Sequence, residues 1–245
     1  MKQTHPQPQS PLNRRDLIRT AGIATMGAAL SGSLSASLRS SARTNLERAL
    51  SKIGGPAALM TQVCTLTPRA TEGPYYLNNR LNRQDISEGK PGLETWYYFL
   101  VVDQNCNPIP GAIVDVWHND GLGVYSGFAN QGTTGQTYIR GVQVANANGL
   151  VGFKSIYPGW YQGRCTHVHL KVHLQNNTAL TTQTYFVDSI SDQVHTLLVP
   201  YSARGAAGRT RNTQDGIFNA ANVMQFFVNP AGGLSLWAGM ILTIP

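Results

Sequence analysis

Short strand-like runs, separated by turns and with no long helical stretch between them, are the feature that most constrains this fold. Residues 96–102 (WYYFLVV) are continuously apolar, and a turn rich in Asp, Asn and Pro precedes residues 112–118 (AIVDVWH). Similar runs follow at residues 149–156, 166–174 and 181–187. Successive strands without intervening helices predict an all-β chain, an antiparallel β-sandwich with long loops, rather than a parallel α/β sheet.

The chain divides into three parts by its pattern. Its 245 residues suffice for one well-buried domain and an N-terminal extension. Residues 44–53 (TNLERALSKI) carry apolar residues on one helical side, and Gly54-Gly55-Pro56 ends that short N-terminal helix. The predicted parts are an export signal in residues 1–43, the helix and a linker in residues 44–63, and a β-sandwich domain in residues 64–245. Residues 202–216 are polar and Gly-rich, which predicts a long surface connection.

Positive charge is concentrated at the N-terminus. Residues 1–43 contain six basic side chains and one acid, a net +5 of the formal +7, which leaves +2 for the rest of the chain. No later basic run is interleaved with aromatic residues, as nucleic-acid-binding surfaces usually are. The charge pattern therefore gives little support to a nucleic-acid partner.

The N-terminal segment itself resembles a bacterial export signal. Residues 13–19 (NRRDLIR) contain a twin arginine, and a stretch of small apolar residues follows at 21–38. Because this stretch is serine-rich and lacks a dense Leu/Ile run, a permanent membrane span is not expected. The pattern predicts a periplasmic or secreted protein exported by the twin-arginine route, with a disordered basic N-terminus as the alternative. The cleavage point stays open.

A pair of histidines gives the first indication of a functional site. His167 and His169 lie within an apolar run of strand length. Because residues i and i+2 project from the same face of a strand, both imidazoles can reach one metal ion. A core or surface role for such a pair is equally common, and His173 on the same face leaves a three-histidine metal site open.

Two tyrosines lie in loops next to predicted strands. Tyr125 follows the strand that ends at His118, in a Gly-flanked turn (GVYSGF), and Tyr161 stands in PGWYQGR, just before the histidine-bearing strand. Loops at strand ends commonly present functional groups on a rigid scaffold. Taken singly, each tyrosine is more often a packed aromatic residue whose hydroxyl is hydrogen-bonded.

Three segments resemble the signatures of the intradiol ring-cleavage dioxygenases, the family that includes catechol 1,2-dioxygenase and protocatechuate 3,4-dioxygenase. They are residues 71–76 (TEGPYY), 111–128 (GAIVDVWHNDGLGVYSGF) and 158–172 (PGWYQGRCTHVHLKV). The order tyrosine, tyrosine, arginine, His-x-His matches the family, and the resemblance spans residues 64–218. It extends to the exported, aromatic-degrading branch, which shares the opening CTLTPxxTEGPYY.

The resemblance implies a ferric iron cofactor. Tyr125, Tyr161, His167 and His169 match the iron ligands of the family residue for residue. Fe(III) is a hard Lewis acid that prefers anionic oxygen, and a bound cation can deprotonate a phenol whose free pKa is about 10. Two tyrosinates and one hydroxide balance the charge of Fe(III), with neutral imidazoles. Tyr161 matches the ligand that leaves on substrate binding and so is also catalytic, whereas Tyr125 matches the one that stays.

The resemblance also implies the reaction and its supporting residues. With O₂, a catechol-type ring would open between its two hydroxylated carbons to give a muconate-type diacid. Arg164 matches an arginine that binds substrate and stabilises negative charge developing on the ring, and Gln183 matches a glutamine that supports it. Gly73, Pro74 and Tyr75 are expected to line the substrate pocket, since a rigid Gly-Pro turn suits a flat aromatic ring.

The cysteines divide into an expected pair and a departure from the family. Cys165 lies inside the third segment, where proline is frequent in the family, and its role is open. Cys64 and Cys106 are therefore the expected disulfide pair in an oxidising compartment.

Too few residues precede the core for the helical region of catechol 1,2-dioxygenases, so their helix-mediated dimer is not carried over and the oligomeric state stays open.

Two other functions remain alternatives at this stage. One is a non-catalytic, exported β-sandwich module that binds an aromatic compound or a carbohydrate. The other is a hydrolytic zinc site built from His167, His169 and His173. An extradiol enzyme is disfavoured, because a carboxylate to complete its two-histidine iron site is not evident. The expected partners are a catechol-type compound and O₂. The sequence does not choose among catechol, a chlorinated catechol, protocatechuate and hydroxyquinol.

Overall fold

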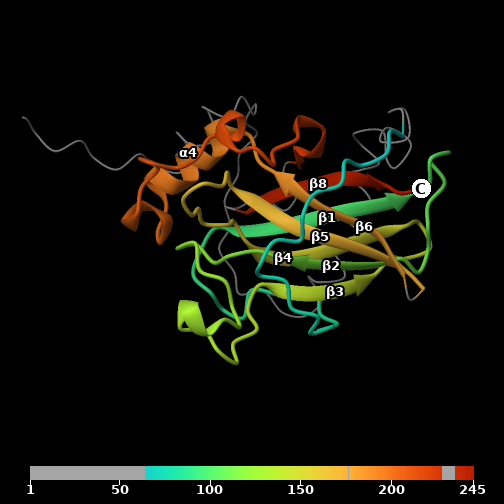
Figure 1. Cartoon of the computed structure of the whole chain (residues 1–245), viewed down its shortest axis with the longest axis horizontal. Coiled ribbons are helices and arrows are strands. Elements are labelled where there is room, and N and C mark those ends of the chain that lie inside the picture. The colour runs from blue at the N-terminus through green and yellow to red at the C-terminus, as the bar shows by residue number, and fades with distance from the viewer. Residues whose placement is uncertain (1–63, 176, 228–234) are drawn as a thin grey trace, which may run out of the picture. The chain divides into compact units, whose positions relative to one another are not determined.

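The computed structural model describes residues 64–175, 177–227 and 235–245. Two four-stranded sheets form a β-sandwich (Figure 1), which confirms the predicted fold class. The first sheet has the order β4-β1-β8-β7, with strands β1 (Glu94–Val102), β4 (Leu150–Ile156), β7 (Gln225–Phe227) and β8 (Leu236–Thr243). The second has the order β3-β2-β5-β6, with strands β2 (Ile113–Trp117), β3 (Arg140–Val144), β5 (His167–Leu174) and β6 (Asn177–Tyr185).

Strand pairing is antiparallel throughout these two sheets except between β1 and β8, which run parallel. The five predicted runs correspond to β1, β2, β4, β5 and β6, although β6 begins at Asn177, before the predicted start of its run at residue 181. Strands β3, β7 and β8 were not predicted. The sandwich is therefore antiparallel with one parallel pair.

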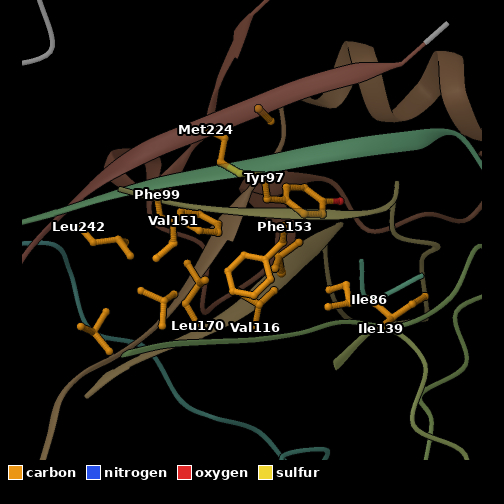
Figure 2. Packing of buried hydrophobic residues seen from close by; sticks show 14 of the residues in the cluster. Ile86, Tyr97, Phe99, Val116, Ile139, Val151, Phe153, Leu170, Met224 and Leu242 are labelled. Carbon is orange, nitrogen blue, oxygen red and sulfur yellow. The ribbon is translucent and has the colours of Figure 1, made fainter. Parts of the chain in front are cut away.

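Alternation along β5 decides which of its side chains reach the core. Val168 and Leu170 are fully buried between the sheets and belong to one cluster with Phe153 of β4, and Figure 2 shows Leu170 and Phe153 there. Because successive strand residues point to opposite faces, His167 and His169 project from the other face of β5, away from the second layer. These two histidines thus lie on the outer face of the second sheet.

Residues 202–216 lie in the segment between β6 and β7 and are mostly exposed, in agreement with the predicted surface connection, although a few of their polar side chains are buried. That segment contains α4 (Asp188–Leu197) and the 3-10 turns η2 (Tyr201–Ala203), η3 (Asn212–Gln214) and η4 (Ala220–Asn222). Arg209 is buried and its Nη2 donates to Asp188 Oδ1 at 2.8 Å, while Asp215 is also buried. These two charged side chains are internal because each has a partner, Asp188 for Arg209 and Arg164 for Asp215, which composition alone does not reveal.

Several predictions concern the N-terminus. The export signal in residues 1–43 and the helix and linker in residues 44–63 lie outside the described residues and stay predictions. At the first described residue, Cys64 forms a disulfide with Cys106, with a Cα–Cα distance of 5.5 Å, which confirms the expected pairing. None of the helices in the described part of the chain has the length and apolar character that a membrane span requires.

Candidate metal centre

Two phenols and two imidazoles converge on the outer face of the second sheet. The His167 Nε2 atom lies 3.0 Å from His169 Nε2, 3.2 Å from the Tyr161 hydroxyl oxygen and 3.5 Å from that of Tyr125. Tyr125, His167 and His169 are buried, whereas Tyr161 is half-buried. The structure therefore brings together all four residues predicted to bind iron.

Sheet register sets the position of the two histidines. His169 of β5 pairs with Trp117 of β2 on one side and with Gln183 of β6 on the other. The Trp117 indole stacks on the His169 ring, with 4.9 Å between centroids and 9° between planes. On the same strand, His167 Nδ1 donates to the Cys165 carbonyl oxygen at 2.7 Å. That hydrogen bond leaves the lone pair on His167 Nε2, the atom that faces the other three groups.

Glycines let the two tyrosine-bearing loops meet backbone to backbone. Gly123, two residues before Tyr125, has φ +87°, and a Cβ there would lie 2.4 Å from the Trp160 carbonyl oxygen. A Cβ on Gly159, two residues before Tyr161, would lie 2.5 Å from both the Asp120 carbonyl oxygen and Gly123 N. Only glycine permits this approach. It sets the Tyr125 and Tyr161 rings edge to face, with centroids 6.0 Å apart.

The protonation preferences of the four side chains suit a cation. Burial, followed by the nearby Arg164 charge, lowers the pKa of His167 to about 3, and burial lowers the pKa of His169 well below its usual value. Both imidazoles are therefore neutral and can offer a lone pair. Burial raises the pKa of Tyr125 and Tyr161, so neither phenol ionises without a compensating positive charge.

Hydrogen bonds within the cluster do not satisfy all of its polar atoms. His167 Nε2 is an acceptor, as fixed by the Cys165 bond, and it faces His169 Nε2 at 3.0 Å. His169 Nδ1 is buried and has no hydrogen-bond partner among the described residues. Two neutral nitrogens and two phenol oxygens around one point match the mixed N/O coordination of Fe(III), which also ionises the phenols. The residues therefore fit ferric iron.

Arg164 borders this cluster and is held by two polar side chains. Its Nε donates to Asp215 Oδ2 at 2.9 Å, and its Nη2 donates to Gln183 Oε1. The Gln183 amide in turn donates from Nε2 to the Thr71 carbonyl oxygen at 2.8 Å. The Arg164 charge opposes the effect of burial on Tyr161 and lowers the pKa of that phenol. Arg164 and Gln183 therefore lie where the sequence predicts.

A statistical model of the dioxygenase family matches residues 71–204, which is more than half of the chain. The chain belongs to the intradiol ring-cleavage dioxygenases. The structure is similar to an intradiol ring-cleavage dioxygenase from Tetranychus urticae, with a TM-score of 0.68 and 32% identity over 74% of this chain and 95% of that one. The family expected from the three sequence segments is confirmed.

Curated relatives of this family member are catechol-type 1,2-dioxygenases. A chlorocatechol 1,2-dioxygenase from Pseudomonas sp. (strain P51) is 35% identical over 148 residues, covering 48% of this chain and 54% of the relative. Catechol 1,2-dioxygenase 1 from Acinetobacter lwoffii is 26% identical over 140 residues, covering 48% and 45%. The matches thus span about half the length of these relatives.

In this intradiol family member the turn predicted to line the ring pocket lies beside the cluster. The Tyr75 ring stacks on Tyr125, with centroids 4.4 Å apart and planes at 16°, and it meets the edge of Phe128. Gly73 lies against His169, since a Cβ on Gly73 would be 3.3 Å from His169 Cε1. Pro74 is an exposed residue of the same turn. Gly73 and Tyr75 therefore border the centre directly.

Other polar residues in the three segments that resemble the family have partners outside the cluster. Tyr76 donates to Asp115 Oδ2 at 3.0 Å, and Lys171 forms an ion pair with Glu72. His118 uses Nδ1 with the Asn119 carbonyl oxygen and Nε2 with a serine hydroxyl, so it has no nitrogen left for a metal. These residues therefore have structural partners of their own and do not contribute to the cluster.

The three-histidine alternative has no matching cluster. His173 lies beyond a register shift in β5 and is hydrogen-bonded at Nδ1 to the Thr178 hydroxyl at 3.1 Å. Across residues 64–175, 177–227 and 235–245, no three or more His, Cys, Asp or Glu side chains form a group that could hold a metal ion. The three-histidine zinc site is therefore not formed among the described residues.

Sequence reasoning missed Asp215 and Arg140. Asp215 was assigned to a surface connection, yet it is bound to Arg164. Arg140 is buried at the start of β3, where Nη1 donates to the Tyr75 carbonyl oxygen at 2.8 Å and Nη2 to that of Ser126 at 2.7 Å. It thereby ties the pocket turn to the Tyr125 loop. Neither residue lies in a segment whose spacing could have indicated these long-range contacts.

Proposed function

We propose that this protein is a ferric-iron dioxygenase that cleaves catechol-type rings between the two hydroxylated carbons, using O₂ and releasing muconate-type diacids. One observation carries the proposal: two phenol oxygens and two imidazole nitrogens converge on one point beside the Arg164 guanidinium. Residues Tyr125, Tyr161, His167 and His169 would hold the metal. Bound there, Fe(III) supplies a trivalent Lewis acid that binds both oxygens of a catechol and activates it toward O₂.

The two tyrosines take different parts in this proposal. Tyr125 is fully buried, stacks under Tyr75 and stays in place. Tyr161 is half-buried and lies in a loop, so its side chain can turn away when substrate arrives. Because burial raises its pKa, a Tyr161 oxygen that faces no cation would hold a proton, and a catechol hydroxyl is the available donor. The exchange leaves no uncompensated buried charge.

The remaining residues orient the ring and stabilise charge. Gly73 and Tyr75 form a wall beside His169 and Tyr125, against which a flat ring can lie. Arg164, held by Gln183 and Asp215, presents a fixed positive charge near Tyr161, where negative charge develops on a bound substrate. Tyr161, Arg164 and Gln183 are therefore the proposed catalytic group.

Export by the twin-arginine route to the periplasm or outside the cell is part of the proposal. The arginine pair at residues 14–15 and the apolar stretch at 21–38 support it. The Cys64–Cys106 disulfide adds support, since such bonds persist mainly in oxidising compartments. Fusion of residues 1–43 to a reporter that must be exported in the folded state would test this, with Arg14→Lys/Arg15→Lys as the matched control. Equal export of both fusions would contradict the assignment.

Oxygen uptake on a panel of catechols tests the reaction. Iron-loaded protein should consume O₂ with catechol, chlorocatechol, protocatechuate or hydroxyquinol and release a ring-opened diacid with the mass of substrate plus O₂. His167→Ala should abolish uptake, whereas His173→Ala, on the same strand but bonded to Thr178, should retain it. The iron-loaded protein should also be red, from tyrosinate-to-iron charge transfer. A colourless protein with stoichiometric iron, or iron binding without uptake on any catechol, would overturn the proposal and favour a binding module.

A further inference from the structure

Asp215 is a buried carboxylate that contacts two residues next to the tyrosine–histidine cluster and lies outside the three segments that resemble the family. It lies directly after η3, in the connection between α4 and β7, and its side chain is 1% exposed. A carboxylate at such depth is stable only when its charge and lone pairs are satisfied. The groups that satisfy it therefore indicate its role.

Each oxygen of Asp215 is occupied. Oδ2 accepts from Arg164 Nε and from the Cys165 backbone N–H, both at 2.9 Å. Oδ1 accepts from the Ile217 backbone N–H at 2.9 Å. These interactions hold the pKa of Asp215 below its usual value despite burial. The carboxylate is thus a fixed anion that joins the 164–165 backbone to the 215–217 turn.

The same contacts extend to a predicted metal ligand. Cys165, whose N–H donates to Asp215, accepts from His167 Nδ1 through its carbonyl oxygen at 2.7 Å. One carboxylate therefore restrains two neighbouring groups, the guanidinium of Arg164 and the carbonyl that orients the His167 ring. Partners of this kind set ligand orientation and commonly matter nearly as much as the ligands.

We infer that Asp215 is a positioning residue that fixes Arg164 and His167 together, so that the substrate-side cation and the metal-side imidazole keep one relative geometry. The inference deepens the proposed function and rests on it. It makes Asp215 different from an ordinary buried ion pair, whose loss would lower stability without altering the centre. A substitution of a positioning residue would alter the centre, whereas a substitution of an ordinary ion-pair residue would lower stability alone.

Metal-free protein provides the first test. Asp215→Ala and Asp215→Asn are compared with Asp192→Asn, which removes a carboxylate that pairs with Arg209 and Arg211 and not with Arg164. Measured by NMR, exchange of the Cys165 amide and the Arg164 Nε–H should accelerate about tenfold or more in Asp215→Ala and be unchanged in Asp192→Asn. Unchanged exchange in a folded Asp215→Ala protein would overturn the inference. If Asp215→Ala does not fold, the nearly isosteric Asp215→Asn decides, with faster Arg164 Nε–H exchange expected.

Iron-loaded protein provides the second test. With catechol as substrate, Asp215→Ala should lower kcat by roughly ten- to a hundredfold, with a smaller change in KM, and Asp215→Asn should lower it less. The visible charge-transfer band should shift in both, because the His167 ring is no longer fixed. In an Arg164→Ala background, Asp215→Ala should shift the band while lowering kcat much less than in wild type. A fully additive loss of kcat, or an unshifted band, would leave Asp215 as a stability residue only.

The two tests separate this inference from the proposed function. A wild-type protein that binds no iron or consumes no O₂ defeats the proposed function, while the exchange measurements still report whether Asp215 anchors Arg164 and Cys165. Conversely, an active wild type with unaltered exchange and kinetics in the Asp215 variants defeats only the role assigned to Asp215.

Discussion

Two loops bring a tyrosine to the same point, but they place it in different surroundings. The Tyr125 side chain is fully buried, stacks on Tyr75, and its loop is tied to Arg140 through Ser126. The Tyr161 side chain is half-buried, and burial raises its pKa although the nearby Arg164 charge opposes that effect. In the proposed function the same functional group would therefore be a fixed ligand in one loop and an exchangeable one in the other, and the difference would come from packing rather than from residue type.

Substitution of the fixed tyrosine should have the largest effect. Tyr125→Phe removes an anionic ligand from the most enclosed position, so we expect substoichiometric iron and turnover below detection. Metal analysis and oxygen uptake measure both. Tyr76→Phe serves as the control, because the Tyr76 hydroxyl donates to Asp115 and not to the centre. Full iron content in Tyr125→Phe would remove the distinction between the loops.

Substitution of the exchangeable tyrosine should be milder and of a different kind. Tyr161→Phe should retain iron through three ligands but lose the oxygen that takes up a substrate proton. We expect kcat to fall by roughly a hundredfold, the size of a typical general-base contribution. The charge-transfer bands of Tyr161→Phe and wild type should also differ more in the resting protein than after catechol is added. Loss of iron comparable to that in Tyr125→Phe would show that both tyrosines are fixed.

The contact between the two loops can be broken without touching either tyrosine. Gly123→Ala places a Cβ 2.4 Å from the Trp160 carbonyl oxygen at φ +87°, so the loops must separate. We expect a loss of about 1–3 kcal/mol in the free energy of unfolding by urea titration, together with reduced kcat. Gly132→Ala is the matched control, because φ is +67° and no atom lies within 4 Å of the added Cβ. That control should lose stability only, and a similar loss of kcat in both would sink the idea.

The smallest effect concerns the histidine that both tyrosines contact. In metal-free protein, burial lowers the pKa of His167 to about 3, whereas an unfolded histidine titrates near 6.5. Between about pH 6.5 and 3 the unfolded state holds the extra proton, so stability falls as the pH falls through this window. His167→Gln should reduce that slope by up to about 1.4 kcal/mol per pH unit, measured by urea titration at several pH values. An unchanged slope would mean that His167 is protonated in the folded state.

Local sequence pattern was sufficient to predict part of the fold and part of the candidate centre. The apolar run at residues 96–102 predicted β1, and strict alternation placed His167 and His169 on one face because that rule depends only on neighbours. By contrast, β3 (RGVQV) contains Arg140 and a glycine, and it offers no apolar run. Its arginine is buried because carbonyl groups from two distant segments surround it.

Long-range partners explain what the sequence could not indicate. Strand β8 pairs in parallel with β1, from the opposite end of the domain, and no local signal specifies that neighbour. Asp215 follows a polar stretch typical of exposed loops, and only contact with Arg164 and Cys165 makes it internal. Family resemblance supplied the pairing of Arg164 with Gln183, which spacing alone would not have predicted.

The disulfide has a consequence for the aromatic pocket. Cys64 and Cys106 are 42 residues apart, and the covalent ring that they close contains the Gly73–Tyr75 turn and the whole of β1. In the chain-entropy model, closing a ring of this size stabilises the folded state by about 4 kcal/mol. Thiol reductants would therefore lower the free energy of unfolding by about that amount while leaving the side chains of the two clustered tyrosines and two clustered histidines chemically intact.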